Sequence, residues 1–392
     1  MASNGKPATG QRRRPAVLNS LPNPGLSLIL QAGDPAPVHA VLILTDEPLG
    51  DFLLKTRRSK YAVIFLGIAI LVMSSRASLA AVNAGSLLAQ RSIKELKPTA
   101  VIRLGKTADW VAIAPDGVWV GSTGPFAVHK IDPKTFKRVA TVKLGGEPCA
   151  GLAIGFGSLW IPLCGRAPTL AKVDLKTNRL TTFLNVGPAA AEGGVTTSSD
   201  SVWLVVDKMG SLARIDPDTG TVRHITRIAP GSYNPLYNDG QIWVTRADGS
   251  EVTGVDAVTG MVLATVRTGP GPRFLTAGAG TVWTLNQGDG SLTRIDTRTR
   301  QATKTIALGI PGHGGDISFG GEMVWTTVRK VPLSMVDGTT AALRCQWTGP
   351  GGDSLGIDHE AIWLTDYHAG TISRIALDDA LAHCNGQAGG QR

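Results

Sequence analysis

The sequence predicts an all-β fold, a seven-bladed β-propeller whose blades are four-stranded antiparallel sheets, from three observations. The chain holds 48 glycines, and only 18% of its residues are charged. A tryptophan recurs about every 40 residues, which is the period of one propeller blade. Short runs of valine, isoleucine, leucine and threonine, bounded by glycine, fill each period, as expected for β-strands.

Each repeated unit carries one tryptophan and, in the first six units, one aspartate downstream of it. The tryptophans are Trp119, Trp160, Trp203, Trp243, Trp283, Trp325 and Trp363, and the aspartates are Asp132, Asp174, Asp216, Asp256, Asp296 and Asp337. Because the tryptophan recurs whatever the loops contain, we expect it to pack between neighbouring blades rather than to bind a ligand. Each aspartate precedes a turn, where its side chain is expected to accept backbone hydrogen bonds.

Turn residues divide the second unit into four strands, named a to d from the central channel outward. The expected strands are "CAGLAIG", "SLWIPLC", "LAKVDL" and "RLTTFLNVG", at residues 149–155, 158–164, 170–175 and 179–187. The units alternate apolar and polar residues with a period of two and are interrupted by glycine. This pattern excludes helical solenoids of similar period.

The last unit stops after its third strand, residues 371–377. Its missing fourth strand is available at the other end of the domain, because "TAVIRLG" at residues 99–105 matches the fourth strands "VATVKLG" and "TKTIALG". We therefore expect residues 99–105 to complete the last blade and close the ring, which leaves no long exposed sheet edge there. The propeller then spans residues 98–380, followed by a C-terminal tail at residues 381–392.

The segment before the propeller has the layout of a secretory signal. Arg57, Arg58 and Lys60 precede an apolar run at residues 61–73, and small residues at 78 and 80 suit a cleavage site after Ala80. A membrane anchor is the competing interpretation, but 13 apolar residues would span only about 20 Å as a helix, against a hydrocarbon core of about 30 Å. We expect a signal peptide at residues 57–80, a periplasmic or secreted protein, and no stable membrane span after cleavage.

Residues 1–56 are rich in proline, glycine, serine and arginine and have no sustained apolar period, so we expect them to be disordered. Signal peptides normally begin a chain, so an alternative is that translation begins near Leu54 and the preceding residues are an over-extended N-terminus.

Four cysteines fit an exported protein. Cys149 and Cys164 flank the turn "GFGS" symmetrically, while Cys345 lies in an expected strand and Cys384 near the C-terminus. In an oxidising compartment the natural pairs are 149–164 and 345–384. Four buried free thiols are the alternative, and the absence of a Cys-x-x-Cys spacing argues against a metal site.

Composition and motifs exclude several classes of function. The net charge of +9 is unevenly placed, with +5 in residues 1–80 and only +4 spread over the rest of the chain. Without a cluster of lysine and arginine in the large domain, no nucleic-acid partner is expected. The sequence has no Gly-x-Ser-x-Gly nucleophile motif and no phosphate-binding loop or dinucleotide fingerprint between a strand and a helix. No quinone-cofactor platform with a calcium site is identifiable. No cofactor is expected unless the protein is an enzyme, in which case it would be Mg²⁺ or another divalent metal.

Two stretches carry a family resemblance: "VWVGS" followed by "HKIDPKTFKRVATVKLG", and "VWTLNQGDGSLTRIDTRTRQATKTIALG". They resemble the YVTN-type β-propellers and, more broadly, the virginiamycin B (streptogramin) lyase-like family, over about the last three quarters of the chain. The resemblance is specific for the fold, whereas propeller repeats of this kind serve unrelated functions.

Sequence variation concentrates on one face of the expected propeller. The loops from strand d to the next strand a and from strand b to strand c share this face, called the top face here, and ligands usually meet the mouth of the channel there. These loops include Asp109, Glu147, Asp207, Gln287 and His368. The residues that we expect to bind a ligand are Trp110, Glu192, Tyr233, Asn234, Arg246, Arg273, Asn286, His313, Arg329, Asp353 and Tyr367.

The lyase resemblance implies a divalent metal that polarises an ester carbonyl and a general base that removes a neighbouring proton. It places histidine and glutamate near the starts of strand a in the last two blades and a glutamate four residues after a blade's tryptophan. Asp353, Leu355 and Tyr367 occupy such positions here, and only His313 lies close to a required one. His313 is therefore the candidate catalytic residue, and the candidate ligands for Mg²⁺ or another divalent metal are His313, Asp316, Asp353 and Asp366.

The leading hypothesis is an exported, non-catalytic propeller that binds a polar small molecule, peptide or protein at the top face. Arg246, Arg273 and Arg329 would favour anionic parts of that ligand. The alternatives are a metal-dependent lyase or hydrolase at the same mouth and an assembly platform that uses the sides of the blades.

Overall fold

The computed structural model describes residues 28–30, 40–42, 90–310 and 314–384. The chain divides into two units, residues 1–75 and 76–392. In the first unit, β1 (Leu28–Leu30) pairs antiparallel with β2 (Ala40–Leu42). The expected signal peptide at residues 57–80 and most of residues 1–56 lie outside the described residues.

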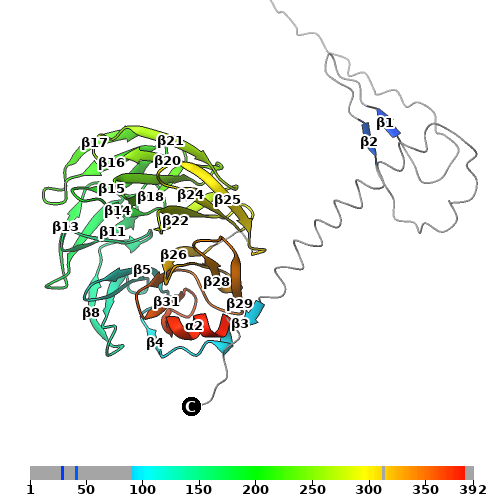
Figure 1. Ribbon diagram of the computed structural model, residues 1–392. Helices are drawn as coiled ribbons and strands as arrows, with labels where there is room; N and C mark the ends of the chain where they lie inside the picture. The colour runs from blue at the N-terminus through cyan, green and yellow to red at the C-terminus, as the bar shows by residue number, and fades with distance from the viewer. Residues whose placement is uncertain (1–27, 31–39, 43–89, 311–313, 385–392) are drawn as a thin grey trace, which may run out of the picture. The chain divides into compact units, whose positions relative to one another are not determined.

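The second unit contains seven sheets of four antiparallel strands that follow one another around a ring, as predicted (Figure 1). Blade 1 consists of β5 (Asp109–Ala114), β6 (Gly117–Ser122), β7 (Ala127–Ile131) and β8 (Arg138–Lys143). Blade 2 consists of β10 (Ala153–Gly155), β11 (Ser158–Cys164), β12 (Thr169–Asp174) and β13 (Arg179–Leu184), with the short β9 (Glu147–Pro148) beside β11. Blade 3 consists of β14 (Val195–Thr197), β15 (Val202–Asp207), β16 (Ser211–Ile215) and β17 (Val222–Arg227).

The remaining blades repeat the same order of strands. Blade 4 consists of β18 (Ser232–Asn238), β19 (Gln241–Arg246), β20 (Glu251–Asp256) and β21 (Val262–Arg267). Blade 5 consists of β22 (Pro272–Gly278), β23 (Thr281–Asn286), β24 (Ser291–Asp296) and β25 (Gln301–Ala307). Blade 6 consists of β26 (Asp316–Gly320), β27 (Met323–Val328), β28 (Val331–Asp337) and β29 (Leu343–Thr348).

Blade 7 is completed by the N-terminal segment, as the sequence predicts. Its strands are β30 (Leu355–Ile357), β31 (Ala361–Asp366), β32 (Thr371–Ala376) and then β4 (Ala100–Arg103), which pairs antiparallel with β32. The side chains that face each other in this pairing include Ile102 and Ile372. The ring is therefore closed by strands from both ends of the domain.

A second connection at the closure was not anticipated from the sequence. β3 (Gln90–Ser92) adds to β29 of blade 6 in parallel, and the short 3-10 helix η1 (Ile93–Glu95) then leads the chain toward β4 in blade 7. The helix α2 (Leu377–Cys384) was not predicted and spans the end of the expected propeller and the start of the expected C-terminal tail. Its Leu377 and Ala380 are buried among residues of blades 6 and 7. Both chain ends of the propeller thus bridge the same two blades.

The recurring tryptophans pack between blades, as expected. All seven are fully buried, and each shares a hydrophobic cluster with residues of the next blade. Trp203 of blade 3, for example, packs with Ile242 and Val244 of blade 4, and Trp363 of blade 7 packs with Val118 and Val120 of blade 1. Burial of a large aromatic side chain at every junction stabilises the whole ring.

A basic side chain on strand c covers most of these tryptophans. In five blades a lysine or arginine directly opposite the tryptophan holds its charge 5.0 to 6.0 Å from the ring centroid. In blades 4 and 6 the opposite residues are Gly254 and Met335. These cation–π pairs give five of the basic side chains a structural role at the blade junctions.

The repeated aspartates close the turns between strands c and d, as predicted. The Asp216 side chain accepts hydrogen bonds from the backbone N–H groups of Asp218 and Thr219, and the other five make the same kind of contact. These bonds lower the pKa of each carboxyl group, to about 2 for Asp216 and Asp337. The carboxylates are therefore structural.

Both expected disulfides are present. Cys149 pairs with Cys164 and Cys345 pairs with Cys384, each with a Cα–Cα distance of 5.7 Å. Disulfides are typical of oxidising compartments, so they are consistent with a protein outside the cytoplasm. Among the described residues, no helix is both long and apolar enough to cross a membrane.

Candidate functional site

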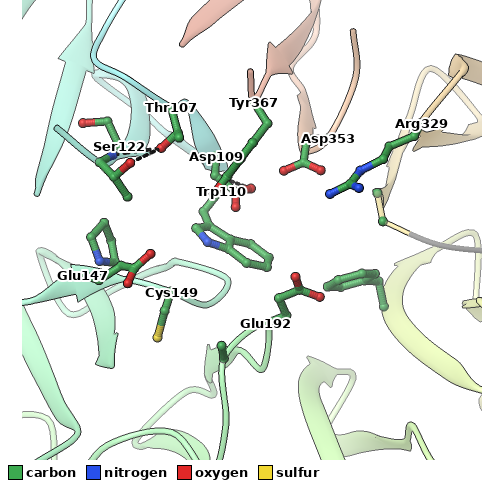
Figure 2. A pocket seen from close by; sticks show the side chains of 16 residues that line it. Thr107, Asp109, Trp110, Ser122, Glu147, Cys149, Glu192, Arg329, Asp353 and Tyr367 are labelled. Atoms are coloured by element: carbon green, nitrogen blue, oxygen red, sulfur yellow. Dashed lines mark hydrogen bonds between the residues drawn. The ribbon is translucent and has the colours of Figure 1, made fainter. Parts of the chain in front are cut away.

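The mouth of the channel holds a cavity of about 180 Å³, called the mouth cavity here (Figure 2). Its lining comes from both kinds of top-face loop, as the sequence predicts. The polar and aromatic side chains that line it are Thr107, Asp109, Trp110, Ser122, Thr123, Glu147, Glu192, Phe274, Arg329, Asp353 and Tyr367. Chemically different groups from widely separated parts of the chain thus meet at one place.

Trp110 and Phe274 form the floor of the mouth cavity. Their rings are tilted at 53° with centroids 6.2 Å apart, and both side chains are buried. A second cavity of about 370 Å³, the channel cavity, lies behind them and is lined by strand a of several blades, with Trp110 and Phe274 in both linings. Trp110 has a φ of 54°, an uncommon left-handed conformation for a non-glycine residue. The strained backbone directs its indole into the middle of the mouth (Figure 2).

Asp109 and Asp353 form a coupled pair of carboxyl groups in the mouth cavity. Burial raises the pKa of Asp109 well above its usual value, and the neighbouring charge of Asp353 raises it further. Burial also raises the pKa of Asp353, against the lowering effects of a hydrogen bond with Asp109 and of the Arg329 charge. Ionising two neighbouring carboxyl groups costs electrostatic free energy unless a positive group lies beside them. The pair therefore retains a proton or attracts a cation.

Asp316 lies below this pair, in the lining of the channel cavity. Its Oδ2 accepts a hydrogen bond of 2.7 Å from Ser354 Oγ, which in turn accepts one of 3.2 Å from the backbone N–H of Val111. Burial raises the pKa of Asp316 to about 6, although the Ser354 hydrogen bond opposes the shift. Asp316 thus connects blades 6, 7 and 1 through Ser354.

Three expected ligand-binding residues form a cluster of their own at the rim. Arg273 Nη1 lies 3.1 Å from Glu192 Oε2, and Arg273 Nη2 donates to the Tyr233 hydroxyl at 3.1 Å. The Arg273 guanidinium also stacks on the Tyr233 ring at 4.7 Å, and Tyr233 donates to the carbonyl of Ala191. Because Arg273 is already engaged by a carboxylate and a ring, its charge is largely compensated.

Two other expected residues have structural contacts instead. Asn234 is buried and donates to the carbonyl oxygens of Glu192 and Arg273, which links blades 3, 4 and 5. Asn286 is fully buried among Thr284, Ser291 and Thr293 and does not line the mouth cavity. The amide satisfies buried hydroxyl groups within its own blade.

The structure does not bring the three expected arginines together. Arg246 forms ion pairs with Asp248 and Glu251 at the end of its own hairpin, at 3.3 and 3.0 Å, and does not line the mouth cavity. Arg273 is paired with Glu192, so only Arg329 contributes a positive charge to the lining. Opposite it stand the carboxylates of Asp109, Asp353, Glu147 and Glu192. The lining therefore holds more carboxyl groups than basic groups.

The described residues do not fit the divalent metal that the lyase resemblance implies. No group of three or more histidine, cysteine, aspartate or glutamate side chains within them is arranged to hold a metal ion. Of the four candidate ligands, His313 lies outside the described residues and Asp366 lines a separate groove beside Leu96 and Lys97. Asp316 and Asp353 are the two that remain near the mouth, on opposite sides of the floor.

A serine–histidine contact also lies at the mouth, which the sequence motifs did not indicate. Ser122 Oγ is 2.8 Å from His129 Nε2, and His129 Nδ1 is 3.0 Å from Thr141 Oγ1. Both Ser122 and His129 are almost fully buried, and burial lowers the pKa of His129 to about 4. A weakly basic imidazole oriented by a hydroxyl is a poor general base, so we assign this contact to the packing of blade 1.

Asp109 and Phe274 are the main residues absent from the expected ligand set. The repeat contains a signal for Asp109, because the tenth residue before the tryptophan of blades 1, 4, 5 and 7 lies at or within two residues of the start of strand a. In these blades that position is Asp109, Tyr233, Arg273 and Asp353, respectively. Phe274 follows this position by one residue, and its inward direction depends on a bulge between β22 and β23 that the sequence does not reveal.

Comparisons with known proteins support the fold but identify no family. No known family profile and no curated protein matches the sequence. Among solved structures, BamB from Moraxella catarrhalis is similar, with a TM-score of 0.52 and 13% sequence identity over 72% of this chain and 100% of the BamB chain. At this identity the likeness shows the β-propeller fold alone.

Proposed function

We propose that this protein is an exported, non-catalytic binding propeller whose mouth cavity holds a polar group of a small molecule, peptide or protein. The observation that carries the proposal is the convergence of charged and aromatic side chains from six blades on one cavity that opens at the top face. Cavities with a few convergent polar groups and perturbed pKa values are the usual places for ligands. At about 180 Å³ the cavity is smaller than the ~300–1,000 Å³ of drug-sized sites, so it suits one functional group of a larger ligand.

The test of this function is to fill the mouth cavity. Ala191→Trp adds a large side chain at an exposed lining position, whereas Lys176→Trp adds the same side chain at an exposed turn elsewhere. We expect the wild type and Lys176→Trp to co-purify with the same ligand, identified by native mass spectrometry, and Ala191→Trp to lose it. Equal retention by all three proteins would place the ligand away from the mouth.

A metal-dependent lyase or hydrolase at the same mouth is the second candidate, on the resemblance to the virginiamycin B lyase-like propellers. Asp109 and Asp353 supply two carboxyl groups at the mouth, but the described residues contain no group of three or more potential metal ligands. Turnover of a cyclic ester that stops with chelator and with His313→Ala would support this candidate. Ligand binding that is unchanged in chelator, without turnover, supports the binding propeller.

Export is part of the proposal and rests on the signal-like segment and the two disulfides. If residues 57–80 are removed as a signal peptide, the mature protein begins at Ala81. N-terminal sequencing of the exported protein checks this directly. A mature chain that retains residues 1–53 contradicts both the cleavage site and the later translation start.

A further inference from the structure

We propose that the group held in the mouth cavity is an organic cation, an ammonium or guanidinium group, which lies on Trp110 between the carboxylates of Asp109 and Asp353. This inference rests on the proposed function, because it names the chemical class of ligand for the same site. It reverses the sequence-based hypothesis that the arginines select an anion.

The charge of the lining is the first argument. Asp109, Asp353, Glu147 and Glu192 face the mouth cavity, and Arg329 is the one positive side chain in its described lining. Glu192 is paired with Arg273 at 3.1 Å, which leaves three carboxyl groups for one guanidinium. A bound cation would allow Asp109 and Asp353 to ionise together in a site where water alone screens them poorly. An anion would add repulsion to the same groups.

The aromatic lining is the second argument, and it is independent of charge. The indole of Trp110 and the ring of Phe274 form the floor, and Tyr367 stands at the wall beside Asp109 and Asp353 (Figure 2). Cations bind favourably over aromatic faces, best over tryptophan, while anions do not. The fold already uses this interaction, since Arg273 stacks on Tyr233 at the rim of the same mouth.

Accessibility is the third argument. The floor formed by Trp110 and Phe274 separates the mouth cavity from the channel cavity, so a ligand enters from the top face and stops at the aromatic floor. A long basic side chain, or a free amine or guanidine, can place its charge at this depth while its apolar stem remains near the rim. A basic side chain of a peptide and a free small cation would bind through the same charged group. Peptide-like and free probes distinguish these two sources.

Binding is measured by calorimetry with probes that differ in one charge. The guanidinium is the single charged group of N-acetyl-arginine methylamide, and N-acetyl-citrulline methylamide is its neutral isostere. N-acetyl-glutamate methylamide is the anionic probe. Butylguanidine and butylamine represent free small cations. We expect the arginine probe to bind at least about tenfold more tightly than the citrulline probe, because only its guanidinium charge can pair with the carboxylates of the cavity. If butylguanidine binds as tightly as N-acetyl-arginine methylamide, a free small cation is sufficient for binding and no peptide backbone is needed.

Variants connect the selectivity to the named residues. Asp109→Asn and Asp353→Asn keep the shape but remove a charge, and each is expected to weaken the arginine probe about tenfold or more. Asp218→Asn, at an exposed turn of blade 3, is the matched control and should not change binding. Tyr367→Leu should weaken binding severalfold, whereas Tyr367→Phe, which keeps the ring, should not. Circular dichroism spectra and unfolding midpoints identify any variant that fails to fold.

The outcomes separate this inference from the proposed function. Tight binding of the glutamate probe, lost in Arg329→Gln, overturns the cation inference and leaves a ligand site at the mouth. Equal binding of the arginine and citrulline probes also overturns it. If no probe binds and Ala191→Trp retains the same co-purifying ligand as the wild type, the proposed function fails as well.

Discussion

Asp337 shows how one repeated residue contributes to the fold. Its side chain accepts hydrogen bonds from the backbone N–H groups of Thr339 and Thr340 and pairs with Arg344 at 2.7 Å. These contacts favour the ionised form and lower its pKa from 3.8 to about 2. Because the folded-state pKa is below the unfolded one, the stabilisation is present above about pH 4 and is lost as the pH falls toward the folded pKa.

Asp337→Asn tests this acid sensitivity. The asparagine oxygen can still accept the turn hydrogen bonds, but it has no charge to titrate. We expect wild type to be more stable than the variant at neutral pH, and the difference to shrink as the pH falls from about 4 toward 2. Urea unfolding at a series of pH values measures it. A stability difference that does not change with pH would show that the charge of Asp337 is irrelevant.

The blade tryptophans have a larger effect on stability than the exposed apolar residues. Trp203 is fully buried between blades 3 and 4, whereas Met209 is exposed in the next turn. We expect Trp203→Ala to cost about 3–5 kcal/mol of unfolding free energy, because it leaves a large cavity at a blade junction. Met209→Ala should stay within about 0.5 kcal/mol of wild type. Similar losses from both substitutions in urea unfolding would contradict the inter-blade packing.

The bounds of a strand were predictable from the sequence where turn residues lie at both of its ends. In blade 2, strand b was expected at residues 158–164 and β11 (Ser158–Cys164) has these bounds. Strand a was expected at residues 149–155, but β10 covers only its last three residues. Residues 149–152 interrupt this strand, because Cys149 and Gly151 hydrogen-bond to Glu192 and Gly193 in the loop before blade 3. The short β9 before them pairs with β11 again.

β3 and α2 could not be predicted because their partners are distant in sequence. β3 is three residues long and pairs with β29 more than 250 positions away (Gln90 with Gln346). The apolar side of α2 packs against Trp347 and Leu96, which lie far from it in the sequence. Such contacts depend on closure of the ring, which a local pattern does not encode.

The Cys345–Cys384 disulfide tests the role of the closure elements. It joins β29 of blade 6 to the end of α2, across a separation of 39 residues. Replacing both cysteines by alanine should lower the unfolding free energy by about 2–4 kcal/mol, by the loss of a cross-link in the unfolded chain. Hydrogen exchange should increase first in α2, β3 and β4. Equal increases in all blades would show that the disulfide does not specifically hold the closure.

At the scale of the whole molecule, the seven-bladed ring and the position of the mouth followed from the tryptophan repeat. The chemistry of the mouth did not, because it depends on which polar side chains pair with one another. Arg273 neutralises Glu192, Arg246 is paired within its hairpin and Asn286 is buried in its blade. What remains in the cavity is mainly acidic and aromatic, whereas a count of loop residues suggested a site for anions.

The most direct test of the account is a crystal structure of the protein with N-acetyl-arginine methylamide at a concentration that saturates the calorimetric binding. We predict density for the guanidinium over the Trp110 ring, within hydrogen-bonding distance of Asp109 and Asp353. Density for the probe on a blade edge or on the opposite face, with the mouth cavity holding only solvent, would contradict the central claim that the mouth is the binding site.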